Sequence, residues 1–220
     1  MSAEGLLYYH EVFLSIQGES TSAGVPCVFI RLYGCNVHCT YCDQPQYKDD
    51  KHKISVANMV SKAMQFGCKN VCITGGEPLI QYESVYQLAL ELINDYDCDV
   101  AIETNGCVKI NPDLYYPKKL KFVMDVKCPS SGVSDNNILD NLMFLRNRDE
   151  VKFVISDVED YEYMKDVLRK YPTQAKILLS PVIHHNSTNG MGKKLVDWML
   201  EDKLYNTRIQ IQMHKFLNVQ

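Results

Sequence analysis

The chain has 220 residues, of which 46% are hydrophobic and 23% charged, and its formal net charge is −4. This composition excludes disordered and fibrous proteins, and it offers no basic surface for nucleic acid or an anionic membrane. No apolar run reaches the roughly 20 residues of a transmembrane helix, and the N-terminal segment does not read as a secretory signal. We therefore expect one cytoplasmic domain over residues 1–220, with no nucleic-acid or membrane partner.

Short apolar, β-branched runs alternate with helical patterns along the chain. The runs predict strands at 27–32, 70–74, 99–103, 120–126, 150–156, 176–181 and 208–213. Apolar residues at helical spacing predict helices within 56–64, 85–93, 138–145, 164–168 and 195–199. Ser55 is the expected N-cap of the first helix and Gly67 its stop, while 46–53 is expected to be a solvated loop.

This alternation predicts a largely parallel sheet with right-handed crossovers. The chain is shorter than the roughly 250 residues of a complete eightfold barrel. We therefore expect an α/β fold of the partial, open (β/α)6 type, with trimmed helices. Active sites on such sheets lie at the carboxyl ends of the strands, so polar motifs that follow strands are the candidates for chemistry.

The odd number of cysteines, 9, excludes a complete disulfide framework. Cys35, Cys39 and Cys42 lie together in a CxxxCxxC pattern after the strand that ends at Leu32. Three thiolates at this spacing could hold an iron–sulfur cluster with one iron open, could belong to a zinc site, or could bind no metal. The remaining cysteines are expected to be small core residues: Cys27, Cys68, Cys72, Cys98, Cys107 and Cys128.

A second motif, Gly75-Gly76-Glu77-Pro78, follows the strand that ends at Thr74. Its glycines allow close backbone approach to a ligand, and its carboxylate could pair with an ammonium group, although the same residues also make an ordinary turn. Together with the cysteine motif, and with Tyr41 before its last cysteine, this motif resembles the radical S-adenosylmethionine (SAM) superfamily. The resemblance implies a 4Fe-4S cluster on the three cysteines, SAM on the fourth iron, and its reductive cleavage to a 5′-deoxyadenosyl radical.

The same resemblance implies a set of SAM-binding residues, for each of which ordinary loop capping is the alternative. Gly75, Gly76 and Glu77 would hold the methionyl amino group, and Tyr41 would touch adenine. Strand-end polar clusters would bind the ribose and the carboxylate. The complete implied set is Tyr41, Asp43, Gly75, Gly76, Glu77, Glu103, Asn105, Lys127, Ser130, Ser180, Pro181 and Val182.

Three further segments, 11–20, 125–132 and 213–220, make the chain resemble the 7-carboxy-7-deazaguanine synthase family from about residue 8 to its end. The resemblance implies a carbon–nitrogen lyase that converts 6-carboxytetrahydropterin to 7-carboxy-7-deazaguanine and ammonia, on the route to deazapurines such as queuosine. A radical would remove hydrogen from the pterin C6, and SAM would be regenerated. It also implies a homodimer and an electron donor such as flavodoxin or ferredoxin.

The resemblance implies a substrate site of Ile16, Gln17, Gly18, Glu19, Arg31, Thr74, His214 and Gln220. Arg31 offers a planar fork to the substrate carboxylate, and Glu19 offers a carboxylate to the pterin N–H groups. His214 and the terminal carboxylate of Gln220 would close the pocket. The alternative is that Arg31 and Glu19 form a surface pair of little value and that His214 caps a strand.

Two positions depart from the family pattern. Gln44 stands where a Thr or Ser usually helps to bind Mg²⁺, and an amide oxygen is a differently placed ligand, so Mg²⁺ binding through Gln44 is in doubt. Ser20 stands where Gly is usual. Two other functions remain open: a glycyl-radical activating enzyme with the same cofactor and a protein substrate, and a non-catalytic zinc module that pairs with a partner protein.

Overall fold

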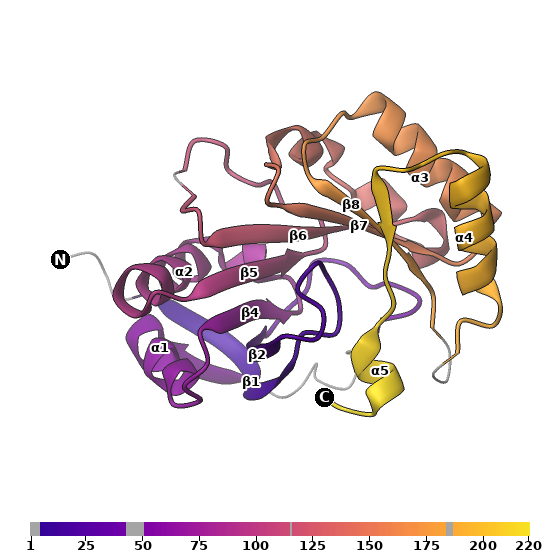
Figure 1. The fold of residues 1–220 in the computed structure, drawn as a ribbon. Coiled ribbons are helices and arrows are strands. Elements are labelled where there is room, and N and C mark those ends of the chain that lie inside the picture. Colours follow the sequence, from indigo (N-terminus) through magenta and orange to yellow (C-terminus); the bar gives the residue numbers. More distant parts are fainter. Residues whose placement is uncertain (1–4, 43–50, 115, 184–186) are drawn as a thin grey trace.

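The computed structural model describes residues 5–42, 51–114, 116–183 and 187–220. Its strands form one mixed sheet in the order β3-β1-β2-β4-β5-β6-β7-β8-β9 (Figure 1). β1 is antiparallel to both of its neighbours, and each later pairing from β2 to β9 is parallel. The strands are β1 Leu6–Ile16, β2 Pro26–Leu32, β3 His52–Ser55, β4 Asn70–Gly75, β5 Asp99–Thr104, β6 Leu120–Val126, β7 Glu150–Ile155, β8 Lys176–Pro181 and β9 Thr207–Ile209.

Because β3 and β9 are the two ends of this order, the sheet is an open, partial barrel, as the strand–helix alternation predicted. The helices are α1 Val56–Met64, α2 Tyr82–Tyr96, α3 Val158–Lys170, α4 Met191–Glu201 and α5 Met213–Leu217. Ser55 caps α1 as expected, since its side chain accepts from the amide of Asn58. None of the described helices has the length and apolar character needed to cross a membrane.

The helix expected within 138–145 is wrong. This stretch forms a 3-10 helix, Leu139–Phe144, instead, and another 3-10 turn, Ser134–Asn136, precedes it. The buried Asn141 side chain accepts from the amide of Ile110 and donates to the carbonyl of Val108. The segment is therefore shaped by polar contacts with the neighbouring loop, which compete with regular helical hydrogen bonding.

The strand expected at 208–213 and the loop expected at 46–53 also need correction. β9 ends at Ile209, and the chain then leaves the sheet, because the amide of Met213 donates to the carbonyl of Gly18 at 2.9 Å. Within 46–53, His52 and Lys53 belong to β3 and pair with β1, while 43–50 lie outside the described residues. Neither β1 nor β3 was among the predicted strands.

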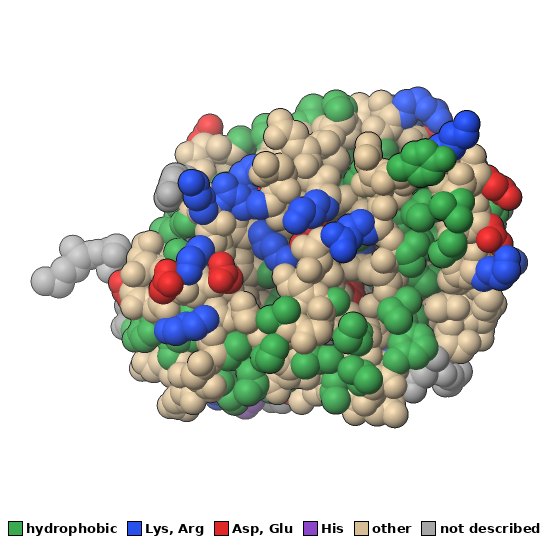
Figure 2. Space-filling view, viewed as in Figure 1, with side chains coloured by type: hydrophobic (Ala, Val, Ile, Leu, Met, Phe, Trp, Pro, Cys, Tyr) green, Lys and Arg blue, Asp and Glu red, His purple; other side chains and the backbone are tan. Residues whose placement is uncertain are grey.

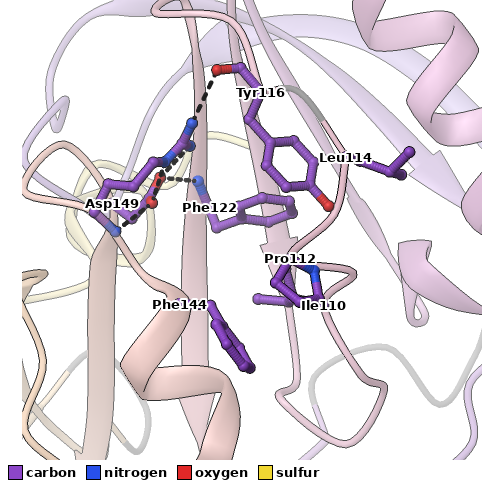
Figure 3. A pocket seen from close by; sticks show the side chains of 8 residues that line it. Ile110, Pro112, Leu114, Tyr116, Phe122, Phe144 and Asp149 are labelled. Carbon is purple, nitrogen blue, oxygen red and sulfur yellow. Dashed lines mark hydrogen bonds and ion pairs between the residues drawn. The ribbon is translucent and has the colours of Figure 1, made fainter.

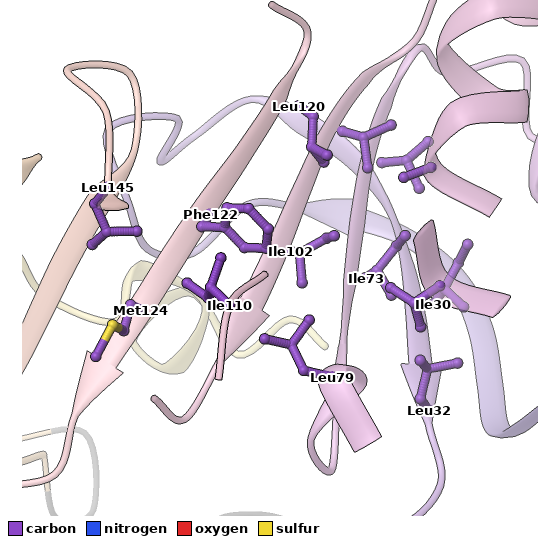
Figure 4. Packing of buried hydrophobic residues seen from close by; sticks show 14 of the residues in the cluster. Ile30, Leu32, Ile73, Leu79, Ile102, Ile110, Leu120, Phe122, Met124 and Leu145 are labelled. Carbon is purple, nitrogen blue, oxygen red and sulfur yellow. The ribbon is translucent and has the colours of Figure 1, made fainter. Parts of the chain in front are cut away.

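The sheet has two chemically different faces. On β2, Val28, Ile30 and Leu32 point to the helices, where they join the main core (Figure 4). Full burial of such a side chain contributes about 1.5–3 kcal/mol. The intervening Phe29 packs on the inner face with Cys27, Cys72 and Phe13, and charged side chains occupy the rest of that face. The polar inner face therefore positions the candidate site.

A hollow of about 290 Å³ lies on the helix side of the sheet, where no helix crosses from β5 to β6 (Figure 3). Arg146 spans one wall, donating to Asp149 at 2.7 Å and to the carbonyl of Tyr116 at 3.2 Å. The lining is Ile110, Pro112, Leu114, Tyr116, Phe122, Phe144, Arg146 and Asp149. None of the predicted site residues lines this hollow, so it is separate from the candidate site.

Candidate active site

The cysteine loop follows β2 and is bonded to three neighbouring loops. The amide of Glu77 donates to the carbonyl of Gly34 at 2.7 Å, which joins it to the loop after β4. Asn36 donates to the carbonyl of Cys107 at 3.1 Å, beyond β5. Thr40 donates to the carbonyls that follow β6, with its hydroxyl 2.8 Å from Ser130 O. The carboxyl ends of three parallel strands thus fix the shape of this loop.

The backbone of Gly75 and Gly76 packs directly against the backbone of the segment that ends β2 and begins the cysteine loop. A Cβ on Gly76 would lie 1.8 Å from the carbonyl oxygen of Gly34, and one on Gly75 would lie 2.4 Å from the amide nitrogen of Leu32. Gly75 also has a φ of +112°, in the region that L side chains avoid. The close approach that these glycines allow is to the cysteine loop itself, and any contact with SAM comes in addition.

Glu77 is fully buried and its carboxylate accepts three hydrogen bonds. Oε1 accepts from the amide of Leu79 at 2.9 Å and from the Thr104 hydroxyl at 2.8 Å. Oε2 accepts from the amide of Asn105 at 2.6 Å. Burial raises the pKa of this carboxyl, and the hydrogen bonds oppose that shift only in part. Glu77 therefore connects the ends of β4 and β5, and its predicted contact with the SAM amino group stays a prediction.

The three motif cysteines are open to a cofactor. Cys35 and Cys42 are exposed and Cys39 is half-buried, so a cofactor can reach all three. Asn105 donates to Cys35 Sγ at 3.6 Å, a contact of the kind that tunes cluster thiolates. No group of three His, Cys, Asp or Glu side chains in the described parts of the chain could hold one metal ion. In a cluster each thiolate would bind a different iron, so the three sulfurs would not share one metal ion.

The loop between β1 and β2 lies over the inner face of the sheet and carries Glu19. Lys152 Nζ lies 2.7 Å from Glu19 Oε2, and Gln212 donates to Oε1 at 2.5 Å. Burial raises the pKa of Glu19, but Lys152, Gln212 and His214 together lower it to about 2. The side chain is therefore a carboxylate at neutral pH, as hydrogen bonding to pterin N–H groups requires.

Gln17 and Thr74 meet at the buried carboxylate of Glu103. Gln17 Nε2 donates to Glu103 Oε1 at 3.2 Å, and the Thr74 hydroxyl donates to Oε2 at 2.9 Å. Burial is the main cause that raises the pKa of Glu103, and the nearby charge of Glu19 raises it further. The predicted role of Glu103 was in binding SAM, whereas its hydrogen-bond partners here are residues predicted to bind substrate.

Arg31 and Gln220 meet at Glu11, which lies opposite Arg31 on β1. Arg31 Nη1 is 2.7 Å from Glu11 Oε1, and its guanidinium lies 4.9 Å from the centre of the Phe13 ring. Gln220 donates through its side chain to Glu11 Oε2 at 2.7 Å, and its backbone oxygen accepts from Ser15. The structure thus brings both predicted substrate residues to the edge of the same face.

Gly18 lies directly under the imidazole of His214. A Cβ on Gly18 would meet His214 Nδ1 at 1.9 Å, so a larger residue at position 18 would displace the ring. The neighbouring Ile16 ends β1. Residues 16–19 therefore lie between the inner face of the sheet and α5.

The other residues predicted to bind SAM differ in whether their polar groups already have partners in the protein. Tyr41 has a buried hydroxyl with no hydrogen-bond partner among the described residues. Ser130 donates to Asp160 Oδ2 at 2.5 Å, so its side chain serves the local structure. Lys127 lies 3.0 Å from Asp125 Oδ2. Ser180, Pro181 and Val182 lie at the carboxyl end of β8, and Asp43 and Gln44 are outside the described residues.

Several residues of this face were not predicted. Lys152 and Asp125 face one another across β7 and β6, and Nζ of Lys152 is 3.3 Å from Asp125 Oδ2. Gln212, Glu11 and Asn36 contact predicted residues directly. The available signal was charged residues at alternate positions of a largely apolar strand, as at Glu150 and Lys152 in Glu150–Ile155. Such a residue must face the polar side of a sheet whose other side is buried.

Comparisons with known proteins agree with this geometry. The profile of the Radical SAM superfamily matches residues 29–130, which include the cysteine loop and both neighbouring strand ends. The open barrel and its cysteine loop thus define a radical SAM enzyme. The crystal structure of QueE from Escherichia coli superposes with a TM-score of 0.75 and covers 95% of each chain at 22% identity, which shows the shared fold.

Curated relatives specify the family. The 7-carboxy-7-deazaguanine synthase of Methanospirillum hungatei is 40% identical over 95% of this chain and 84% of its own length. The protein of that name from Clostridium acetobutylicum is 36% identical over 94% of both chains. The chain belongs to the 7-carboxy-7-deazaguanine synthase family.

Proposed function

We propose that this enzyme converts 6-carboxytetrahydropterin to 7-carboxy-7-deazaguanine and ammonia, with a 4Fe-4S cluster on Cys35, Cys39 and Cys42. The observation that supports the proposal most is the proximity of two sets of residues. Thr74 and Gln17 both donate to Glu103 on the inner face. Three residues after Thr74, the amide of Glu77 donates to Gly34 in the cysteine loop. A pterin held by the first set would lie beside a cofactor held by the second.

The bound cluster and SAM would supply the radical that abstracts hydrogen from the pterin. The residues of the chain would bind and orient the substrate. Arg31 would pair with the pterin carboxylate through its planar fork, and Glu19 would accept hydrogen bonds from the N–H edge. His214 and α5 would cover the opposite side and exclude water. Both requirements, a cation at one end and an anion at the other, are met on one face of the sheet.

The SAM contacts are proposed with differing support. A backbone contact through Ser180 to Val182, and the unpartnered buried hydroxyl of Tyr41, suit a bound adenosine. Lys127 offers an ammonium to a carboxylate, although Asp125 already occupies part of it. Mg²⁺ would depend on Gln44, whose amide offers one neutral oxygen, and we propose it only as an addition to the cluster.

A homodimer is part of the proposal. Exposed apolar side chains are contributed by β1, by the loop before β2 and by the C-terminal region: Leu14, Val25, Ile211, Phe216, Leu217 and Val219. Figure 2 shows hydrophobic side chains gathered on the lower and right parts of the face in view. Such surface is often covered by a partner chain. An external reductant such as flavodoxin or ferredoxin would deliver the electron to the exposed cysteine loop.

One experiment tests the reaction. The reconstituted protein is incubated without oxygen with SAM, a reductant and 6-carboxytetrahydropterin, and products are identified by mass. We expect 7-carboxy-7-deazaguanine and ammonia in equal amounts, with SAM recovered. Cleavage of SAM that is indifferent to the pterin would contradict the synthase proposal and would favour a protein substrate, as in activating enzymes.

A further inference from the structure

A continuous chain of buried ion pairs runs across the inner face of the sheet. Lys152 Nζ is 2.7 Å from Glu19 Oε2 and 3.3 Å from Asp125 Oδ2, and Lys127 Nζ is 3.0 Å from the same Asp125 oxygen. All four side chains are between 12% and 16% exposed. The chain therefore connects the loop that carries Glu19 with the strand end that carries Lys127.

We propose that Lys152 is a positioning residue for the pterin, which holds Glu19 as a carboxylate in the orientation that accepts the substrate's N–H donors. The inference rests on the proposed function and adds to it a residue that no sequence motif predicts. Lys152 uses one lone pair of Oε2 and Gln212 uses one of Oε1, which leaves one lone pair on each oxygen. Those two acceptors match two adjacent donors on a pterin edge.

The surroundings of Glu19 make this cation necessary. The charged or titratable groups that act on Glu19 are Lys152 from β7, His214 from α5 and Glu103 from β5. Glu103 and burial both disfavour the ionised form of Glu19, and Lys152 is the main group that favours it. Burial lowers the pKa of Lys152 itself, but Asp125, Glu19 and Glu103 raise it well above its ordinary value. Lys152 thus stays charged throughout the range in which an enzyme works.

Asp125 keeps Lys152 in place from the opposite side. Its Oδ2 faces both lysines, and Oδ1 is buried without a hydrogen-bond partner among the described residues. Such an unused buried acceptor is uncommon in a folded protein unless a bound molecule supplies the donor. The same ion-pair chain that fixes Glu19 therefore also contains an acceptor available to a ligand.

The test measures binding of 6-carboxypterin, an oxidised analogue, to the reconstituted holoenzyme with SAM from pH 5.5 to 8.5. For Lys152→Met we expect the affinity for 6-carboxypterin at pH 6 to be at least about tenfold weaker than in the wild type, because Glu19 without Lys152 is protonated at this pH. The affinity should recover in part toward pH 8.5, where Glu19 loses that proton. Lys152→Arg should keep the wild-type pH profile. In the Glu19→Gln background, Lys152→Met should leave the profile unchanged, since no carboxylate remains to titrate.

Lys121→Met is the matched control. Lys121 is also an inner-face lysine, paired with Glu150 at 2.7 Å, but it does not contact Glu19. Lys121→Met should lower stability without a new loss of binding at acidic pH. If Lys152→Met does not fold, Lys152→Gln replaces it in the test. A Lys152 variant that binds the analogue with the wild-type profile overturns the positioning role. Failure of the wild type to bind any pterin overturns the proposed function instead.

Discussion

The amide of Asn105 donates a 2.6 Å hydrogen bond to the buried carboxylate of Glu77. The side chain of the same asparagine donates to Cys35 Sγ and to Asn36 Oδ1. Asn105 and Glu77 therefore form a junction between the ends of β4 and β5 and the cysteine loop. The shape of the cluster site depends on this junction as well as on the cysteines themselves.

Glu77→Gln should therefore weaken both stability and SAM cleavage. A glutamine amide would set its own N–H groups against one of three existing donors, and such a buried mismatch costs about 1–3 kcal/mol. Thermal unfolding and SAM-cleavage assays would measure both effects. Glu83→Gln, on the first turn of α2, is the control and should behave like the wild type. Unchanged stability of Glu77→Gln would argue against the junction.

Replacement of Cys35, Cys39 or Cys42 by Ala should abolish the 4Fe-4S absorbance and all SAM cleavage. Each of these thiolates would bind a different iron, so no other ligand can substitute. Cys27→Ala and Cys128→Ala should retain the cluster, because both side chains are buried and neither belongs to the CxxxCxxC motif. Anaerobic absorbance spectra compare the variants directly. A normal spectrum for Cys39→Ala would refute the cluster assignment.

Arg31→Ala should lose pterin turnover and keep uncoupled SAM cleavage. Its guanidinium is held by Glu11 and lies over Phe13, so it is ready to bind a carboxylate without reordering. The lost charged hydrogen bond is worth about 1.5–3 kcal/mol, or tenfold or more in affinity. Lys at position 31 should rescue partly, since an ammonium lacks the planar fork. Normal turnover by Arg31→Ala would rule out this contact.

The backbone at Ser20 suits glycine, the residue that the family resemblance implies at this position. Its φ is +66°, in the left-handed region, and its hydroxyl accepts from the amide of Ser22 at 3.0 Å. Ser20→Gly relieves the strain but loses that bond, so we expect a change in unfolding free energy within about 1 kcal/mol. Ser20→Val should cost at least about 1–2 kcal/mol, because a branched side chain is disfavoured there. Chemical denaturation measures both, and a stable Val variant would contradict this backbone conformation.

The ionisation of Glu19 should make the free energy of unfolding depend on pH in the acidic range. Its pKa is about 2 in the folded protein against an ordinary value of 4.5, so its contribution is complete above about pH 4.5 and disappears as pH falls toward 2. By linkage this contribution is on the order of 3 kcal/mol at neutral pH. The difference in unfolding free energy between the wild type and Glu19→Gln should be constant from pH 5 to 8 and shrink below that. A difference between the two unfolding free energies that grows as pH falls would contradict a lowered pKa for Glu19.

The sequence by itself determined the parallel strands from β2 to β8 and the cysteine loop, because both depend on local order. Apolar runs of four to seven residues and a fixed cysteine spacing are readable along the chain. The antiparallel β1 and β3 were not predicted, since their pairing depends on long-range register and their residues alternate less clearly. The 138–145 segment likewise has helical spacing, but Asn141 hydrogen-bonds to a distant loop.

Only the tertiary structure decided which polar residues share the inner face. Along the sequence Lys152 is a charged residue in a largely apolar strand. The sheet register places it opposite Asp125, and the β1–β2 loop brings Glu19 Oε2 within 2.7 Å of its Nζ. The sequence motif predicts a SAM contact for Glu77, and only the fold shows that its buried carboxylate is also hydrogen-bonded to Thr104 and Asn105. The physical reason is common to both cases: the role of a charged side chain depends on its partners and its burial, and long-range contacts fix both.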